Sequence, residues 1–163
     1  MTEFDYAVLL IVGISVAIGA WRGLVREAFS LAGWVLAFVA ANAWGDEAAG
    51  MLRSAIHNEQ ARVVAAFVLV FIVVLLAMGI AGMLLSRLLQ VAGLGLADRG
   101  LGAIFGLARG IVVVLVLVLL GGLTTLPKEP MWRNALLAPP LETAVIAGKP
   151  WMPRDIAERI RYK

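Results

Sequence analysis

The chain lacks cysteine, contains one histidine, and has charged side chains at only 15% of its 163 positions. Without cysteine it forms no disulfide and offers no thiolate to a metal ion. His57 alone does not complete a zinc or haem site, so we expect no metal and no cofactor. Proline is absent from residues 1–126 and occurs six times after them, so the residue that most often interrupts a helix is missing from most of the chain.

Catalytic and nucleic-acid-binding motifs are missing as well. The four serines, Ser15, Ser30, Ser54 and Ser86, lie outside any Gly-x-Ser-x-Gly elbow and have no histidine at motif spacing. No glycine-rich phosphate loop is present, and no basic run is interleaved with aromatics as in a nucleic-acid-binding surface. We therefore expect a protein that is not an enzyme, has no catalytic residues and binds no nucleic acid.

Apolar residues are what the chain has in excess, at 62% of the sequence with a mean hydropathy of +0.94. A soluble domain is about half apolar and about a quarter charged. A chain of 17.4 kDa has too little interior to hide this much apolar surface. The surplus is therefore expected to face lipid or other membrane proteins.

Long apolar runs predict an all-α polytopic membrane protein of about four transmembrane helices. A spanning helix needs about 20 apolar residues, and the candidate runs cover residues 6–20, 28–44, 63–85 and 100–123. The first two runs are short, so a re-entrant hairpin remains an alternative for them. The stretches 46–62 and 86–99 are expected to be amphipathic or interfacial linkers, and whether 86–99 lies in or on the membrane stays open.

The composition changes after residue 126, which divides the chain into a membrane domain, 1–126, and a proline-containing tail, 127–163. The tail is expected to end in a short polar helix over residues 155–162. Trp132 and Trp151 suit the headgroup region, where tryptophan is enriched in membrane proteins.

Arginines between the runs predict the orientation, because Lys and Arg gather on the cytoplasmic side of a membrane. Four arginines lie in the links 21–27 and 86–99, which share one side, and two lie in the link 46–62 on the other. This count favours a multi-pass membrane protein with both termini outside the cytoplasm. Lys128 and Arg133, close to the last run, argue for the opposite orientation.

Small residues recur every fourth position in three of the runs. This spacing places them on one helix face, where helix backbones approach closely in lipid. The residues of this predicted packing seam are Ser15, Gly19 and Gly23, then Gly33, Ala37 and Ala41, then Gly102, Gly106 and Gly110. Two interpretations stay open: packing within one four-helix bundle, or self-association, as a homodimer, through the fourth run.

Arg109 is the charge inside the fourth run, about 14 Å beyond Gly100 along a helix. A charge at this depth usually faces the bundle interior, a partner or water. Arg109 is therefore a candidate site for an anionic solute. The structural alternative is snorkelling, or pairing with Glu27 or Asp98, which enter the membrane from the same side. Other polar residues are scarce inside the runs, which favours a scaffold over a transporter.

Three sequence blocks together resemble the colicin V production protein family of bacterial inner-membrane proteins. They are Asp5-Tyr6 leading into WRGLVREAFSL (21–31), DRGLGAIFGLARG (98–110), and WRNALLAP (132–139), where the family more often has serine in place of Ala135. The resemblance implies a small polytopic protein linked to production or export of a peptide toxin and to envelope stress, with no catalytic mechanism attached. The family's spans also occur fused to a protease, which suggests a scaffold or anchor.

The resemblance and the residues lead to one functional hypothesis and one alternative. We expect an accessory scaffold of the inner membrane that supports production or secretion of a colicin V-type bacteriocin and envelope homeostasis. Its expected partners are the lipid bilayer and other membrane proteins, or a second copy of itself. The alternative is a small transporter or channel with Arg109 lining the path.

Overall fold

The computed structural model describes residues 1–148 and 150, and within them it contains helices and no strands. Four helices are long and apolar enough to cross a membrane: α1 (Glu3–Arg22), α2 (Leu24–Met51), α3 (Glu59–Val91) and α4 (Gly95–Gly122). The shortest, α1, has 20 residues and is about 30 Å long, which matches the hydrocarbon core of a bilayer. The all-α prediction with four candidate spans is confirmed. The predicted helix over 155–162 and Trp151 lie outside the described residues.

The helices run well beyond the uncharged runs. Most of the predicted interfacial segment 86–99 is helical, because α3 continues to Val91 and α4 begins at Gly95. Leucine, arginine and glutamine dominate the end of α3, and these residues extend a helix readily. The break falls at Gly93, whose φ of 80° is in the left-handed region that glycine adopts without strain. At the other end of α3, Asn58 Oδ1 accepts a hydrogen bond from Ala61 N at 3.1 Å and caps the helix.

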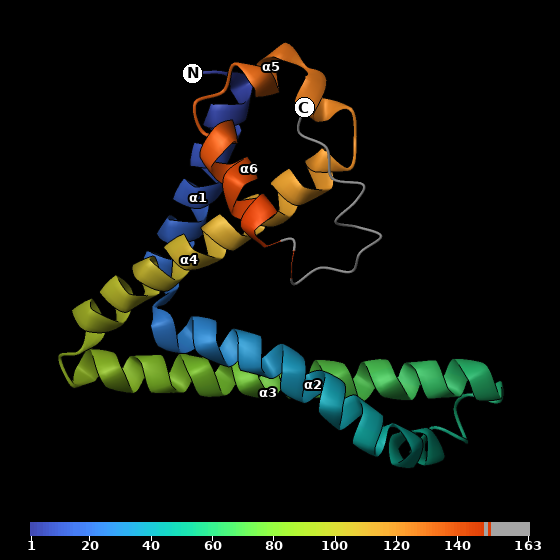
Figure 1. Cartoon of the computed structure of the whole chain (residues 1–163). Helices are drawn as coiled ribbons and strands as arrows, with labels where there is room; N and C mark the ends of the chain where they lie inside the picture. Colours follow the sequence, from blue (N-terminus) through green and yellow to red (C-terminus); the bar gives the residue numbers. More distant parts are fainter. Residues whose placement is uncertain (149, 151–163) are drawn as a thin grey trace. The chain divides into compact units, whose positions relative to one another are not determined.

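Contacts divide the chain into two compact units, and residues 22–102 form one of them. Its centre is the antiparallel pair α2 and α3, which lie side by side (Figure 1). Aromatic rings follow this pair, with centroids 5.5 Å apart for Trp34 and Phe71 and 6.1 Å apart for Phe38 and Phe67. The later residue of α2 meets the earlier residue of α3, so the two helices run antiparallel and form a helical hairpin.

The other unit contains residues 1–21 and the described residues from 103 onward. In it α1 and α4 pack with η1 (Leu126–Lys128), α5 (Pro130–Arg133) and α6 (Ala138–Ala147). The buried apolar core of this unit is Phe4, Val114, Val118, Trp132, Ala135, Ala138 and Val145. This core joins the start of α1 to α5 and α6. The division into 1–126 and 127–163 stays a prediction.

Trp132 lies in this core, where its side chain packs against the protein and is not exposed to lipid. Its side chain is 5% exposed, and its ring centroid lies 4.6 Å from that of Phe4. Its indole Nε1 donates a hydrogen bond to Glu142 Oε1 at 2.7 Å. The ring also covers Gly121, where an added Cβ would lie 2.7 Å from the indole. A small residue on α4 therefore makes room for the tryptophan of α5.

The outer faces of the long helices are apolar and exposed. Only 6% of the most apolar window of α3 is buried, and Val64 and Leu76 on it are 63% and 61% exposed. In water such a surface would favour aggregation. In a bilayer it faces lipid chains, while the helical hydrogen bonds satisfy the backbone.

Candidate functional site

The small-residue seam of the fourth run packs α4 against α1 of the same chain. Gly106 and Gly110 are buried. A Cβ added at Gly106 would collide with the carbonyl oxygen of Ser15, and one at Gly110 would lie 3.1 Å from Val12 Cα and from Ser15 Cβ. Glycine at these positions therefore brings the two backbones into contact. Of the two interpretations of this seam, the contact supports packing within one chain.

Ser15 and Arg109 form a polar cluster at the centre of this seam. Ser15 Oγ donates a hydrogen bond to the carbonyl oxygen of Gly106 at 2.7 Å. Arg109 Nε donates to Ser15 Oγ at 3.0 Å, and Arg109 Nη2 donates to the carbonyl oxygen of Ser15 at 3.2 Å. Arg109 lies about 20 Å from either end of α4. The serine thus brings hydrogen-bond acceptors to a charge at a depth where water is scarce.

The two carboxylates proposed as partners of Arg109 make contacts of their own in the other unit. Glu27 is 2% exposed, and its Oε1 lies 3.9 Å from Arg22 Nη1. Asp98 is 6% exposed and accepts a hydrogen bond from the backbone N of Val25. Pairing of Arg109 with Glu27 or Asp98 therefore stays a prediction.

Asp98 caps the start of α2 from a different helix. Its Oδ1 accepts from Val25 N at 2.9 Å, where a helix has unpaired N–H groups and a partial positive charge. Gly23 precedes α2 with a φ of 83°, and a Cβ there would collide with the carboxylate of Asp98. The four-residue spacing predicted that Gly23 shares a helical seam with Ser15 and Gly19. The structure instead places Gly23 after the end of α1, outside that helix. It interrupts the helix because its backbone is left-handed, and it leaves room for Asp98.

Gly23→Ala tests this arrangement, with Gly93→Ala as its matched control. Both glycines have a φ near 80°, but a Cβ at Gly93 meets nothing within 4 Å. Gly93→Ala should cost only the left-handed strain of about 1–2 kcal/mol. Gly23→Ala should cost clearly more, because the methyl group also displaces Asp98. Thermal unfolding in detergent measures both, and equal losses would contradict the capping role of Asp98.

The seam of the second run packs α2 against α3. A Cβ at Gly33 would lie 3.1 Å from Met78 Cβ, and Ala37 and Ala41, one and two turns further, are 0% and 1% exposed. From the opposite helix, Gly82 of α3 lies against Phe29, and a Cβ added at Gly82 would lie 2.7 Å from Phe29 Cβ. The remaining predicted seam residues, Gly19 and Gly102, are also buried.

Asp5 was missed as a site residue. It is 0% exposed and accepts three backbone hydrogen bonds: from Thr2 N at 2.9 Å, from Leu136 N at 3.2 Å and from Leu137 N at 2.9 Å. The carboxylate thereby joins the start of α1 to the chain that leads into α6. The signals in the sequence were an acid at the start of an apolar run and its place in the first block of the resemblance, and two of its three partners lie more than 130 residues away.

The polar clusters described above hold elements of the chain together, and none of them pairs a nucleophile with a base. The partners of the Ser15 hydroxyl are a carbonyl and a guanidinium, neither of which takes up its proton. Among residues 1–148 and 150, no three His, Asp or Glu side chains gather closely enough to hold a metal ion.

Comparison with known proteins places the chain in a family. Residues 4–146 match the family model described as Colicin V production protein. The chain belongs to the colicin V production protein family. A colicin V production protein homolog of Haemophilus influenzae is 32% identical over 136 residues, which is 83% of each chain. The colicin V production protein of Escherichia coli is 31% identical over 140 residues, 85% of this chain and 86% of the relative. No solved structure matches the chain.

The three blocks that carry the resemblance to the colicin V production family contribute to the polar contacts described above. Val25 of the first block binds Asp98 of the second. Gly106 of the second block accepts from Ser15, and Leu137 of the third donates to Asp5. The resemblance therefore falls on residues that hold helices together.

Proposed function

We propose that this protein is an accessory scaffold of the bacterial inner membrane that supports production or secretion of a colicin V-type toxin and envelope homeostasis. It acts by binding other membrane proteins and catalyses no reaction. The family membership carries the proposal, because two relatives named for colicin V production align with more than four-fifths of this chain.

The distribution of polar and apolar groups supports a scaffold. Ser15, Asp98 and Asp5 form hydrogen bonds within the chain, while the outer faces of the helices remain apolar and exposed. Because α1 covers Gly106 and Gly110, partner proteins or a second copy would bind these outer faces. Trp34 and Phe38 on α2, 60% and 59% exposed, are large side chains of the kind that dominates such contacts.

The geometry of α1 and α4 bears on the proposed orientation. Phe4 at the start of α1 packs with Val118 near the end of α4, and Ser15 packs with Gly106 nearer its start. The two helices are therefore antiparallel, so the start of α1 and the end of α4 lie on the same side of a membrane. The arginine distribution then supports both ends outside the cytoplasm.

Complementation tests the proposal. An Escherichia coli strain that lacks its own relative of this chain and carries the genes for colicin V should secrete little active toxin. Expression of this chain should restore secretion, measured as growth inhibition of a sensitive strain and as toxin in the medium. Normal membrane insertion without restored secretion would contradict the role in toxin production.

Arg109 gives a specific reason to keep the transporter as a second candidate, because it holds a charge near the middle of α4. Single cysteines at positions 101–117 of the complementing protein, in a chain without native cysteine, distinguish the two. Under the scaffold proposal, a membrane-impermeant thiol reagent labels only the ends of this stretch. A helical stripe of labelled positions that reaches 109 would instead indicate a water-filled path.

A further inference from the structure

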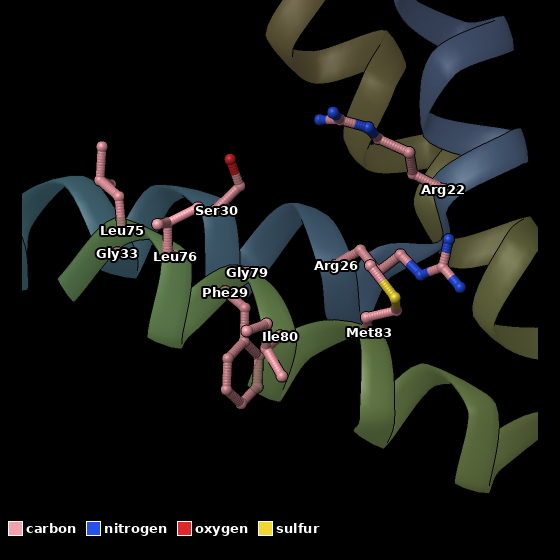
Figure 2. Close-up of a pocket in the computed structure, with 10 residues that line it drawn as sticks. All are labelled: Arg22, Arg26, Phe29, Ser30, Gly33, Leu75, Leu76, Gly79, Ile80 and Met83. Atoms are coloured by element: carbon pink, nitrogen blue, oxygen red, sulfur yellow. The ribbon is translucent and has the colours of Figure 1, made fainter. Parts of the chain in front are cut away.

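A groove of about 390 Å³ runs between α2 and α3 within the unit of residues 22–102. Its lining is polar at one end and apolar along the rest of its length. Figure 2 shows Arg22 and Arg26 at one end and Gly33, Leu75 and Leu76 at the other. Phe29, Ser30, Gly79, Ile80 and Met83 complete the lining.

The groove extends along α2 and α3 over most of the thickness of one leaflet of a bilayer. The lining residues run from Arg26 to Gly33 on α2 and from Leu75 to Met83 on α3, which is about 11–12 Å along each helix. Half of the hydrocarbon core is about 15 Å thick. Arg22 and Arg26 flank the break at Gly23, where α1 ends and α2 begins, so the basic end lies at the membrane surface. The apolar end then reaches toward the middle of the bilayer.

The groove lining itself contains two arginines and no carboxylate, while Glu27 and Asp98 lie next to its basic end. Arg22 has a side chain that is 53% exposed and lies 3.9 Å from Glu27, which offsets one of the two arginines. Arg26 Nε is buried and has no hydrogen-bond partner among the described residues. An anionic group with several acceptor oxygens would bind the two guanidinium groups and supply a hydrogen-bond acceptor for Arg26.

The apolar part of the groove has free space. A Cβ at Gly79 meets nothing within 4 Å, although the residue lines the groove. Leu76 and Ile80 beside it are 61% and 57% exposed. An acyl chain would bury these side chains and fill the space above the glycine.

We propose that this groove binds one anionic phospholipid, with its phosphate at Arg22 and Arg26 and an acyl chain along Leu76, Gly79 and Ile80. The volume lies in the range of small-ligand sites, about 300–1,000 Å³. Basic pockets between membrane helices at the cytoplasmic surface bind anionic headgroups in this way, and the arginine count places this end of the groove on that side.

Lipid titration of the purified full chain tests the proposal. The protein is delipidated in detergent and titrated with phosphatidylglycerol or phosphatidylcholine of the same acyl chains, and native mass spectrometry counts the bound lipids. One phosphatidylglycerol should bind more tightly than any phosphatidylcholine. Arg26→Gln should weaken the tight site about fivefold, since a basic residue near the surface contributes about 1 kcal/mol to anionic lipid binding. Gly79→Leu fills the groove and should lower occupancy several-fold with the helix content unchanged.

Two matched variants separate this site from general effects. Arg87→Gln removes an arginine from the same helix pair outside the groove, and Ala77→Leu adds the same bulk on an exposed part of α3 away from it; both should retain the tight site. Equal weakening by Arg87→Gln and Arg26→Gln would overturn the proposal in favour of diffuse surface charge. Equal affinity for the two lipids, or a protein dimer that dissociates in Gly79→Leu and binds no lipid, would overturn it as well.

Discussion

Gly106→Ala should lower the thermal stability of the purified protein by about 1–3 kcal/mol, although only a methyl group is added. The new Cβ would collide with the Ser15 carbonyl oxygen of α1, and backbone atoms yield less than side chains. Separation of the helices would also lengthen the 2.7 Å hydrogen bond from Ser15 to the Gly106 carbonyl. In a membrane, the hydrophobic effect does not compensate for the loss of this contact, because lipid chains are as apolar as the helix surfaces.

Gly13→Ala is the matched control, because Gly13 lies on α1, two residues from Ser15, with nothing within 4 Å of its added Cβ. It should leave stability unchanged or raise it, since alanine is a better helix former than glycine. Unfolding in detergent, followed by circular dichroism, compares the two. If Gly106→Ala were as stable as Gly13→Ala, the α1–α4 contact would be wrong. If Gly106→Leu folded normally and lost only a dimer, the seam would face a second copy.

The spans and the residues of the seams could be predicted from the sequence. Unbroken apolar runs fix where helices can cross a bilayer, and four-residue spacing places Gly106 and Gly110 on one face whatever the partner. The surface against which Gly106 packs could not be predicted. Spacing within one helix carries no information on whether Gly106 meets the same chain or another copy, whereas the placement of α1 beside α4 supports packing within the chain.

The partners of the polar residues were also not predictable from the sequence. Asp98 was a candidate partner for Arg109 because it enters the membrane from the same side. Nothing in the sequence indicated that its carboxylate caps α2, whose start is more than 70 residues earlier in the chain. Gly23 fitted the four-residue pattern but has a positive φ, which no spacing reveals. Pattern reasoning within a segment thus located the residues, while contacts distant in sequence determined their roles.

Asp5→Ala should release the segment 126–148 while the four long helices remain folded. The change removes the acceptors for the N–H groups of Leu136 and Leu137, which otherwise bind the carboxylate at 3.2 and 2.9 Å. Hydrogen bonds to a charged group contribute about 1.5–3 kcal/mol each. With a loss of about 3 kcal/mol, amide hydrogen exchange in this segment should accelerate about a hundredfold. Mass spectrometry of peptides from the segment measures this change.

Glu3→Ala is the control, because Glu3 is an exposed acid in the same first turn of α1. Both variants remove one negative charge from the helix N-terminus, so the helix-dipole contribution is matched and only the contacts of Asp5 differ. Glu3→Ala should leave exchange in the segment unchanged. Unchanged exchange in Asp5→Ala would mean that Phe4 and Trp132, packed 4.6 Å apart, hold the segment alone. Faster exchange in Asp5→Ala alone would show that the buried carboxylate, more than the apolar core, determines where the C-terminal segment docks.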